Sequence, residues 1–250
     1  MQNHIFLNRY TPEQSGSHLI MTVLLFDIDN TLLDFDKAEY DALGKIFAHY
    51  HIADTDENRA IYSRENKALW RIHESGGMSR EALTSTRFVK AFEALNVWSD
   101  GLDGVAIDAE YQTYLSEGHE LMSHAKELLS VLTERRQEMY VVSNGTSRVS
   151  RPRIVEAGIA EYFQEIFISE EVGAHKPSRE FFERVFAQID SAERKEFTIV
   201  GDSLATDILG GRNAGIHTVW YNPKHLMYSE DIKPECEISD LLEILELVGE

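Results

Sequence analysis

Four short segments of this 250-residue chain gather carboxylates, hydroxyls and one lysine, which are side chains that reaction sites commonly use. The segments are Asp27-Ile28-Asp29-Asn30-Thr31, Ser143-Asn144-Gly145, Gly173-Ala174-His175-Lys176-Pro177 and Gly201-Asp202-Ser203-Leu204-Ala205-Thr206-Asp207. A carboxylate that attacks as a nucleophile is ionised and cannot also donate a proton, so Asp27 and Asp29 would divide these two roles. Carboxylates gathered this closely repel one another, and a hard divalent cation with oxygen ligands, Mg²⁺ above all, removes the repulsion.

Each segment taken alone has a plainer interpretation. Asp202 would be a helix N-cap, Asp207 a solvated helix residue and Lys176 a surface lysine. Ser143-Asn144-Gly145 would be no more than a turn. The joint occurrence of the four segments is what argues for a reaction site, because a plain interpretation has to explain four coincidences at one edge of one sheet.

The four segments follow short apolar runs that are typical of strands buried on both faces of a parallel sheet. The runs cover residues 22–26, 139–143, 165–169, 197–201 and 216–220. Helical patterns lie at residues 125–135, 149–157, 177–188 and 204–214, with a terminal amphipathic helix over 241–247. Gly158 and Gly215 follow two of these helices, where a left-handed residue would end them. The alternation predicts an α/β fold with a doubly wound, Rossmann-like parallel sheet, whose ligands bind at the carboxyl ends of the strands.

Residues 34–120 interrupt the alternation, because they show helical periodicity and no convincing strand. Apolar stripes at helical spacing include Leu43, Phe47 and Tyr50, and then Phe88, Phe92 and Leu95. We therefore expect an all-helical domain at 35–120, inserted into a catalytic core made of 22–34 and 121–250. Residues 1–21 are polar and lack a basic start followed by an apolar run, so we expect a disordered extension rather than a secretory signal.

The charge balance narrows the range of partners. The chain carries 24 Lys and Arg against 43 Asp and Glu, a net charge of −19, which repels nucleic-acid phosphates and anionic lipid. We therefore expect no nucleic-acid partner. We also expect no membrane partner, since no stretch reaches the roughly 18 apolar residues of a membrane span. A single cysteine, Cys236, excludes an internal disulfide and a multi-cysteine zinc site, and it fits a reducing cytoplasm, where we expect the protein to reside. The expected assembly is a monomer or a small homo-oligomer, and the cysteine does not distinguish between them. The histidines show no ligand spacing, and only His175 is expected near the site.

The four segments also carry a family resemblance. The patterns Asp-x-Asp-x-Thr, Ser-Asn-Gly, Gly-x-x-Lys-Pro and Gly-Asp-Ser-x-x-x-Asp resemble, in order, the four motifs of the haloacid dehalogenase superfamily. The resemblance runs from about Val23 to the C-terminus. The helical insertion after the first motif resembles the first type of cap domain of that superfamily.

The resemblance and the chemistry of the side chains imply the same roles. Asp27 would attack phosphorus and form an aspartyl-phosphate, while Asp29 would protonate the leaving oxygen and then deprotonate water. Mg²⁺, with Mn²⁺ as a possible substitute, would be held by Asp27, the backbone carbonyl of Asp29 and Asp202, with Ser203 and Asp207 in support. The residues expected to bind the phosphoryl group are Thr31, Ser143, Asn144, Gly145 and Lys176, and Lys176 would also neutralise the charge that develops during transfer.

Asp29 narrows the choice among the reactions that this superfamily catalyses. Dehalogenases of this superfamily lack the second carboxylate of the first motif, because a halide leaving group needs no general acid. Its presence implies phosphoryl transfer. Hydrolysis is favoured over a phosphomutase reaction, because nothing in the sequence indicates shielding of a phospho-enzyme from water.

The substrate is expected to be recognised in the cap. Segments at 33–39, 66–70, 86–88 and 169–173 are similar to the bacterial pyrimidine 5′-nucleotidase branch, which implies nucleoside monophosphates such as dUMP, dTMP or UMP as substrates. Phe35 and Trp70 would stack on a base or pack within the protein, and Asn66 and Arg87 would read a base edge or sugar or face solvent. Three alternatives stay open: a phosphatase for a sugar phosphate or phosphoglycolate, a phosphomutase, and an inactive relative that serves as a binding module.

Overall fold

The structure is a computed structural model that describes residues 23–97, 101–189, 196–228 and 230–248. It divides into two compact units. The first, the sheet unit, contains the described residues up to Asp34, Leu121–Ser147 and the described residues from Ile154 onward. The second, the helical unit, contains Phe35–Glu120 and Arg148–Arg153, and the sequence pattern does not single out the latter segment. The extension expected at 1–21 lies outside the described residues.

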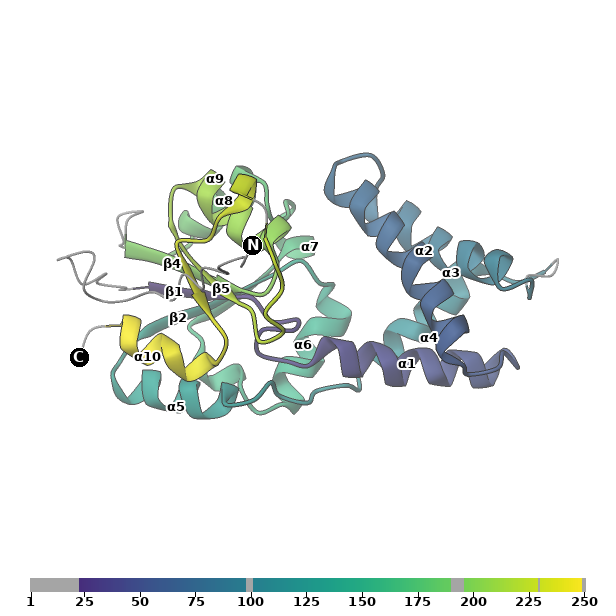
Figure 1. The fold of residues 1–250 in the computed structure, drawn as a ribbon, viewed down its shortest axis with the longest axis horizontal. Coiled ribbons are helices and arrows are strands. Elements are labelled where there is room, and N and C mark those ends of the chain that lie inside the picture. The colour runs from purple at the N-terminus through teal and green to yellow at the C-terminus, as the bar shows by residue number, and fades with distance from the viewer. Residues whose placement is uncertain (1–22, 98–100, 190–195, 229, 249–250) are drawn as a thin grey trace, which may run out of the picture. The chain divides into compact units, whose positions relative to one another are not determined.

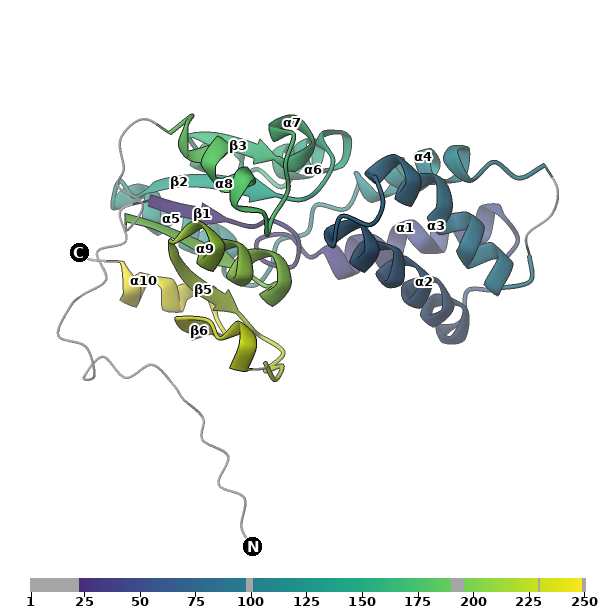
Figure 2. The same cartoon turned by 90° about the horizontal axis from the view of Figure 1, so that it is seen from above.

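The sheet unit is built on six parallel strands in the order β3-β2-β1-β4-β5-β6 (Figure 2). The strands are β1 (Val23–Phe26), β2 (Glu138–Ser143), β3 (Glu165–Ile168), β4 (Phe197–Gly201), β5 (His217–Tyr221) and β6 (Cys236–Ile238). The doubly wound parallel fold expected from the sequence is therefore confirmed. β6 was not predicted, because it has only three residues and its central Glu237 is exposed, so it presents no apolar run.

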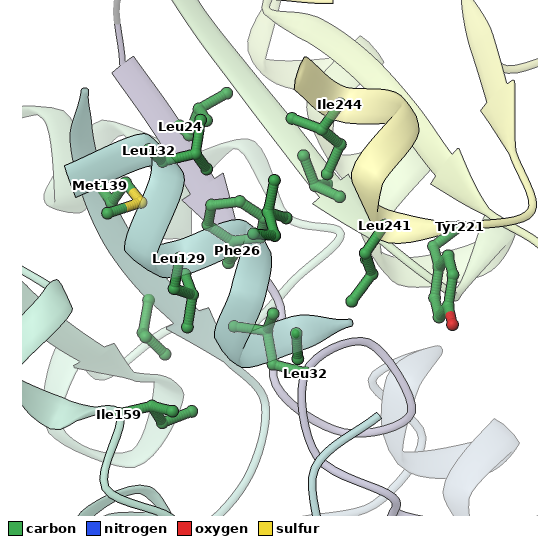
Figure 3. Close-up of a cluster of buried hydrophobic side chains, with 14 of the residues drawn as sticks. Leu24, Phe26, Leu32, Leu129, Leu132, Met139, Ile159, Tyr221, Leu241 and Ile244 are labelled. Atoms are coloured by element: carbon green, nitrogen blue, oxygen red, sulfur yellow. The ribbon is translucent and has the colours of Figure 1, made fainter. Parts of the chain in front are cut away.

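Alternate residues of each strand pack on opposite faces of the sheet. Leu24 and Phe26 of β1 pack on one face against α5 (Ala125–Glu134) and α10 (Ile244–Leu247), and Figure 3 shows them facing Leu129 and Leu132. Val23 and Leu25 pack on the other face with side chains of α8 (Arg179–Phe186) and α9 (Leu209–Ala214). Figure 1 shows these two layers of helices around the sheet. Both faces are buried, which explains the uninterrupted apolar runs.

The remaining helical segments lie between the strands or after β6. They are α6 (Ser147–Glu156), η2 (Ala160–Tyr162), α7 (Ser169–Val172), η4 (Leu204–Ile208), η5 (Glu230–Ile232) and η6 (Leu241–Glu243). α6 belongs in part to the helical unit. Gly158 and Gly215 adopt left-handed φ values of 64° and 73°, as expected for residues that end helices. The helix expected over 204–214 is instead a π-helical turn, η4, followed by α9.

The helical unit consists of α1 (Phe35–His49), α2 (Asp56–Glu74), α3 (Arg80–Ala94) and α4 (Gly104–Leu115). α2, α3 and α4 begin at side chains that accept hydrogen bonds from the first turn, namely Thr55, Ser79 and Asp103. α3 packs on both α2 and α4, and α1 packs on α4, around a cluster that includes Phe47, Phe88 and Phe92. Every regular element of the described residues of this unit is helical. Nowhere in the described chain is a helix both long and apolar enough to cross a bilayer.

Candidate active site

The polar segments meet where β1 and β4 end side by side. The strand order turns at this pair, and ligands bind at such a switch point in doubly wound sheets. Asp27 follows β1 directly, and its N–H donates to the carbonyl of Val200 in β4 at 2.9 Å. Asp202 follows β4 directly. Asp27, Asp202 and Asp207 offer carboxylate oxygens that all lie within 4.8 Å of one another.

Lys176 is buried at the centre of this cluster. Its Nζ donates to Asp27 Oδ1 and to Asp207 Oδ1, both at 2.6 Å, and to the backbone carbonyl of Val142 at 2.8 Å. These three acceptors use all three hydrogens of the ammonium group. Burial alone would lower the pKa of Lys176, but the charges of Asp207 and Asp27 outweigh burial and hold that pKa above its ordinary value. The lysine is therefore a fixed positive charge beside Asp27.

One lysine does not balance the carboxylates. Burial raises the pKa of Asp27 to about 7, with contributions from the charges of Asp207 and Asp29 that oppose the effect of Lys176. Burial, together with the charges of Asp27 and Asp207, raises the pKa of Asp202 to about 8. The protein thus collects more negative charge at this edge than it neutralises by itself, which is the electrostatic setting of a divalent cation site.

The donor set fits a hard cation such as Mg²⁺. All three carboxylates supply oxygen, and the described residues offer no histidine or cysteine within this cluster. Asp207 is already engaged on both oxygens, by Lys176 and by the N–H of Ser203 at 3.0 Å. Asp27 also accepts on both oxygens, from Lys176 at 2.6 Å and from Thr31 at 3.3 Å, so Lys176 is held between the carboxylates of Asp27 and Asp207.

Asp29 lies in a tight turn after β1 and is half-buried. Asn30 adopts a left-handed φ of 60°, and its N–H donates to the carbonyl of Leu33 at 2.8 Å, which closes the turn. An asparagine tolerates this conformation better than most residues do. The charge of Asp29 contributes to the raised pKa values of Asp27 and Asp202, as expected for a carboxylate at the same end of the sheet.

Thr31 differs from the expectation that it binds phosphate. Its hydroxyl is fully buried, donates to Asp27 Oδ2 at 3.3 Å and accepts the N–H of Asp202 at 3.0 Å. The hydroxyl therefore links the chain after β1 to the chain after β4. Its one hydrogen is already donated to Asp27 and is not available to a phosphate. A local sequence motif does not reveal this, because Asp202 is 171 residues away.

The second segment begins where β2 ends. Ser143 is buried, and its Oγ accepts the N–H of Gly145 at 3.0 Å. The side-chain amide of Asn144 pairs with the backbone of Lys176 through two hydrogen bonds of 2.9 Å, one to its N–H and one to its carbonyl. The Asn144 side chain thus fixes the segment that carries the lysine, in addition to the phosphate-binding role predicted for this position.

The π-helical turn η4 places Asp207. The Cβ of an alanine at position 201 would lie 2.3 Å from the Asp207 carboxyl group, so only glycine leaves room for that group. Ser203 caps the turn, since its Oγ accepts the N–H of Thr206 at 3.3 Å and its N–H donates to Asp207. π-helical turns occur frequently at functional sites, and this one turns the Asp207 carboxylate back toward Lys176.

The four residues expected to recognise substrate lie in the helical unit. Asn66 is buried, and its Nδ2 donates to Glu39 at 3.2 Å, while its Oδ1 is buried without a hydrogen-bond partner. Tyr111 also donates to Glu39, at 3.4 Å. Asn66 therefore does not face solvent, which was one of its two interpretations. Sequence reasoning missed Glu39, whose position on α1 resembles that of any exposed helical glutamate.

Arg87 is also buried, and its guanidinium forms an ion pair with Asp108 of α4. The ion pair links α3 to α4, and the burial of Arg87 contradicts the solvent-facing interpretation. Trp70 is half-buried and packs edge-to-face on His73, with ring centroids 5.7 Å apart. Phe35 is half-buried as well, and the guanidinium of Arg153 lies 5.5 Å from its ring centroid.

Sequence reasoning also missed Trp220, which lies in β5 at the same edge of the sheet as Asp202. Its indole Nε1 donates to the backbone carbonyl of Asp202 at 2.7 Å. An aromatic donor near the carboxyl end of a strand next to the site is the signal that could have identified it. His175, the one histidine expected near the site, has its Nδ1 3.1 Å from the carbonyl of Lys176.

Comparison with known proteins gives a consistent result. Residues 24–221 match the family model of haloacid dehalogenase-like hydrolases. The chain is 38% identical over 226 residues to the pyrimidine 5′-nucleotidase PynA of Streptococcus pneumoniae, covering 89% of this chain and 94% of PynA. It is 32% identical to the pyrimidine 5′-nucleotidase YjjG of Escherichia coli, covering 90% and 96%. A magnesium-bound crystal structure of the HAD-hydrolase YfnB from Bacillus subtilis superimposes with a TM-score of 0.85 at 36% identity, covering 92% of this chain and all of YfnB.

Proposed function

Since the chain belongs to the haloacid dehalogenase-like hydrolase family, we propose that it is a Mg²⁺-dependent phosphomonoesterase in which Asp27 is the nucleophile. One observation carries the proposal. Lys176 joins Asp27 and Asp207 through hydrogen bonds of 2.6 Å beside Asp202, at the switch point of the sheet. This arrangement supports the proposal, because phosphoryl transfer requires a nucleophile, a fixed positive charge and oxygen ligands for a cation, and these side chains can supply all three.

Asp27 starts the reaction. Its carboxylate oxygen forms a bond to phosphorus while the ester P–O bond breaks, and Asp29 gives its proton to the departing alcohol oxygen. In the second half, Asp29 takes a proton from water, the water oxygen bonds to phosphorus, and the bond between phosphorus and the Asp27 oxygen breaks. Inorganic phosphate leaves, and both carboxyl groups return to their starting states.

The neighbours of Asp27 make this possible. Lys176 and Thr31 each hydrogen-bond one oxygen of the Asp27 carboxylate and fix its orientation. Ser143 and the backbone N–H groups of Asn144 and Gly145 would bind the phosphoryl oxygens near the start of α6. Gly145 has no side chain, so a phosphoryl group can approach its backbone closely. Its N–H also donates to Ser143 Oγ at 3.0 Å.

Asp27, Asp202 and the backbone carbonyl of Asp29 would hold Mg²⁺, with Mn²⁺ as a possible substitute. The cation supplies positive charge that offsets both the clustered carboxylates and the phosphate dianion. The raised pKa values of Asp27 and Asp202 support a cation at this place, because both carboxylates lack sufficient neutralising charge within the chain.

We further propose pyrimidine nucleoside 5′-monophosphates as substrates. Support comes from PynA and YjjG, which are named for this activity and match most of the chain. The helical unit offers suitable chemistry, since an aromatic ring at Trp70 can stack on a base and the amide of Asn66 can hydrogen-bond to one. The pairing of Asn66 with Glu39 orients the amide, because an ionised carboxylate accepts only from its Nδ2.

A phosphate-release screen tests both parts of the proposal. UMP, dUMP and dTMP are compared with sugar phosphates and phosphoglycolate, with and without Mg²⁺, and Asp27→Asn serves as the inactive control. We expect Mg²⁺-dependent release that is fastest for the nucleotides and absent in Asp27→Asn. Rapid acid quenching should trap phosphate on the wild-type chain and not on the variant. Activity of Asp27→Asn above a few per cent would remove Asp27 from its role, and preference for a sugar phosphate would overturn the substrate assignment.

A further inference from the structure

The peptide unit that joins Asp202 to Ser203 is held at both ends. Its carbonyl oxygen accepts a hydrogen bond from the indole Nε1 of Trp220 at 2.7 Å. Its N–H, which belongs to Ser203, donates to Asp207 Oδ2 at 3.0 Å. The preceding N–H, that of Asp202, donates to Thr31 Oγ1 at 3.0 Å. The backbone on both sides of the Asp202 side chain is therefore fixed by side chains of other elements.

Trp220 occupies a position from which only its side chain can make this contact. In the register of β4 and β5, Trp220 lies opposite Gly201, the last residue of β4. Beyond Gly201 the chain leaves the sheet and enters the turn η4, so the carbonyl of Asp202 has no strand partner. The indole N–H takes the place of the missing backbone donor. A buried carbonyl left without a donor costs free energy, which makes this contact a constraint on the local backbone.

The indole can only donate a hydrogen bond. Tryptophan has a single N–H donor and no acceptor, so Trp220 can bind the carbonyl end of the peptide unit and not its N–H end. The ring is 1% exposed and packs edge-to-face on Tyr228, with centroids 5.7 Å apart and planes at 89°. Because the ring is almost fully enclosed by the protein, it has no room to turn away. The peptide plane after Asp202 is thereby held in one orientation.

The orientation of this peptide plane affects the charged cluster in two ways. It sets the backbone dihedral that aims the Asp202 carboxylate. It also presents the Ser203 N–H to Asp207, whose other oxygen accepts from Lys176 at 2.6 Å. A continuous series of hydrogen bonds thus runs from the indole through one peptide unit to the carboxylate that holds the lysine.

We propose that Trp220 is a positioning residue that sets the affinity of the site for its divalent cation by holding the peptide unit between Asp202 and Ser203. The inference rests on the proposed function in one respect, the assignment of Asp202 as a metal ligand. Trp220 touches neither substrate nor reacting atoms. Its contribution is to hold a ligand in place before the cation binds, which lowers the cost of organising the site.

Trp220→Phe removes the N–H and keeps an aromatic ring in β5. We expect Mg²⁺, titrated calorimetrically into the metal-free protein, to bind about ten-fold more weakly. We expect the Mg²⁺ concentration for half-maximal activity to rise by the same factor, while kcat at saturating Mg²⁺ stays within about two-fold of wild type. A residue that only supported the fold would lower kcat and the melting temperature without shifting the Mg²⁺ midpoint.

Tyr228→Leu is the matched control, because it removes the ring that packs on Trp220 and keeps the indole N–H. It should leave the Mg²⁺ affinity at the wild-type value. If Trp220→Phe does not fold, replacement of Trp220 by β-(3-benzothienyl)alanine exchanges the N–H for sulfur in a ring of nearly the same shape. This variant should show the same ten-fold loss of affinity.

Three outcomes overturn the inference: wild-type Mg²⁺ affinity in the variants that lack the N–H, an equal loss in Tyr228→Leu, and absence of Mg²⁺ binding in the wild-type protein. The calorimetric titration measures Mg²⁺ binding without any phosphate ester. The inference about Trp220 and the proposed function can therefore be contradicted independently of each other. Weaker Mg²⁺ binding in Trp220→Phe, together with a wild-type protein that hydrolyses none of the esters, would sustain the inference and overturn the function. Hydrolysis with an unchanged Mg²⁺ affinity would do the reverse.

Discussion

The carboxyl group of Asp207 occupies the space that a side chain at Gly201 would need, and a Cβ there would lie 2.3 Å from it. Gly201→Ala should therefore push Asp207 away from Lys176. We expect a loss of about 1–3 kcal/mol in the free energy of unfolding and a fall in activity of at least about a hundred-fold, since a displacement near 1 Å is enough for that. Denaturant unfolding and phosphate release measure the two effects. Near-wild-type activity would mean that the position of Asp207 is not critical.

Asp29→Ala tests the general acid. The alcohol oxygen of a nucleotide leaves poorly without a proton, whereas a nitrophenolate leaves well without one. We expect the variant to lose about 10²–10⁴-fold of its activity on nucleotides and much less on p-nitrophenyl phosphate. Steady-state rates on both esters give the comparison. Equal losses would assign Asp29 a role other than proton transfer.

Asp202→Asn tests the electrostatic cost of the site. Because burial raises the folded-state pKa of Asp202 to about 8, above its ordinary value of 3.8, the folded protein holds this proton more tightly than the unfolded chain does. The wild-type protein therefore has its full free energy of unfolding at low pH, where Asp202 is protonated in both states. Part of that free energy is lost as the pH rises from about 4 toward 8. In the absence of metal, the variant should therefore melt higher than wild type, by about 2–4 °C for each kcal/mol relieved. The difference should grow between pH 5 and pH 9.

If Asp202 is a ligand of Mg²⁺, the cation should shift the relative stability of the two proteins in favour of the wild type. Saturation to 100 times the dissociation constant should stabilise the wild type by about 2.7 kcal/mol and leave Asp202→Asn nearly unchanged. Thermal melts with and without Mg²⁺ at each pH provide the measurement. An equal response of the two proteins to Mg²⁺ would exclude Asp202 as a ligand.

Trp70→Ala separates base stacking from packing. If the ring stacks on the nucleotide base, KM for UMP should rise by about ten-fold or more, because stacking contributes about 1–3 kcal/mol per base. KM for p-nitrophenyl phosphate should stay constant. Ile72→Ala, at an exposed position of the same helix, is the control. Parallel changes in KM for both esters would show that Trp70 only packs within the helical unit.

Arg87→Met asks whether the buried arginine serves structure or substrate. Removal of one partner of a buried ion pair leaves the charge of Asp108 uncompensated and should cost about 3–5 kcal/mol. Arg87→Met combined with Asp108→Leu should recover most of that loss. We expect KM for nucleotides in the double variant to stay close to wild type. A double variant that regains stability but shows a much higher KM would return Arg87 to the substrate site.

Much of the fold follows from local patterns that leave little choice. Both faces of the sheet are buried, so strands such as Val23–Phe26 are plain apolar runs. Asp27 and Asp202 directly follow two of these runs, and a parallel sheet places the ends of adjacent strands together. The proximity of Asp27 to Asp202 is thus a consequence of topology. The chemical roles of these residues stay predictions until activity is measured.

What the sequence did not reveal depends on partners far along the chain. Arg87 resembles a surface arginine until α4 brings Asp108 against it, and the Thr31 hydroxyl resembles a ligand until β4 brings the N–H of Asp202 to it. The π-helical turn was missed for a similar reason. Apolar periodicity over 204–214 describes either kind of helix, and only the space beside Gly201 decides where Asp207 must go.

The central place of β1 also bears on how the enzyme is made. Val23 pairs with Glu138 on one side and with Phe197 on the other, so β1 gains its second neighbour only after β4 has been synthesised. Until residue 197 has emerged, β1 has an open hydrogen-bonding edge that a chaperone or a second nascent chain can occupy. Translation that stops before β4 yields a polypeptide that contains Asp27 but neither Asp202 nor Asp207, so the carboxylate cluster cannot form in such a fragment.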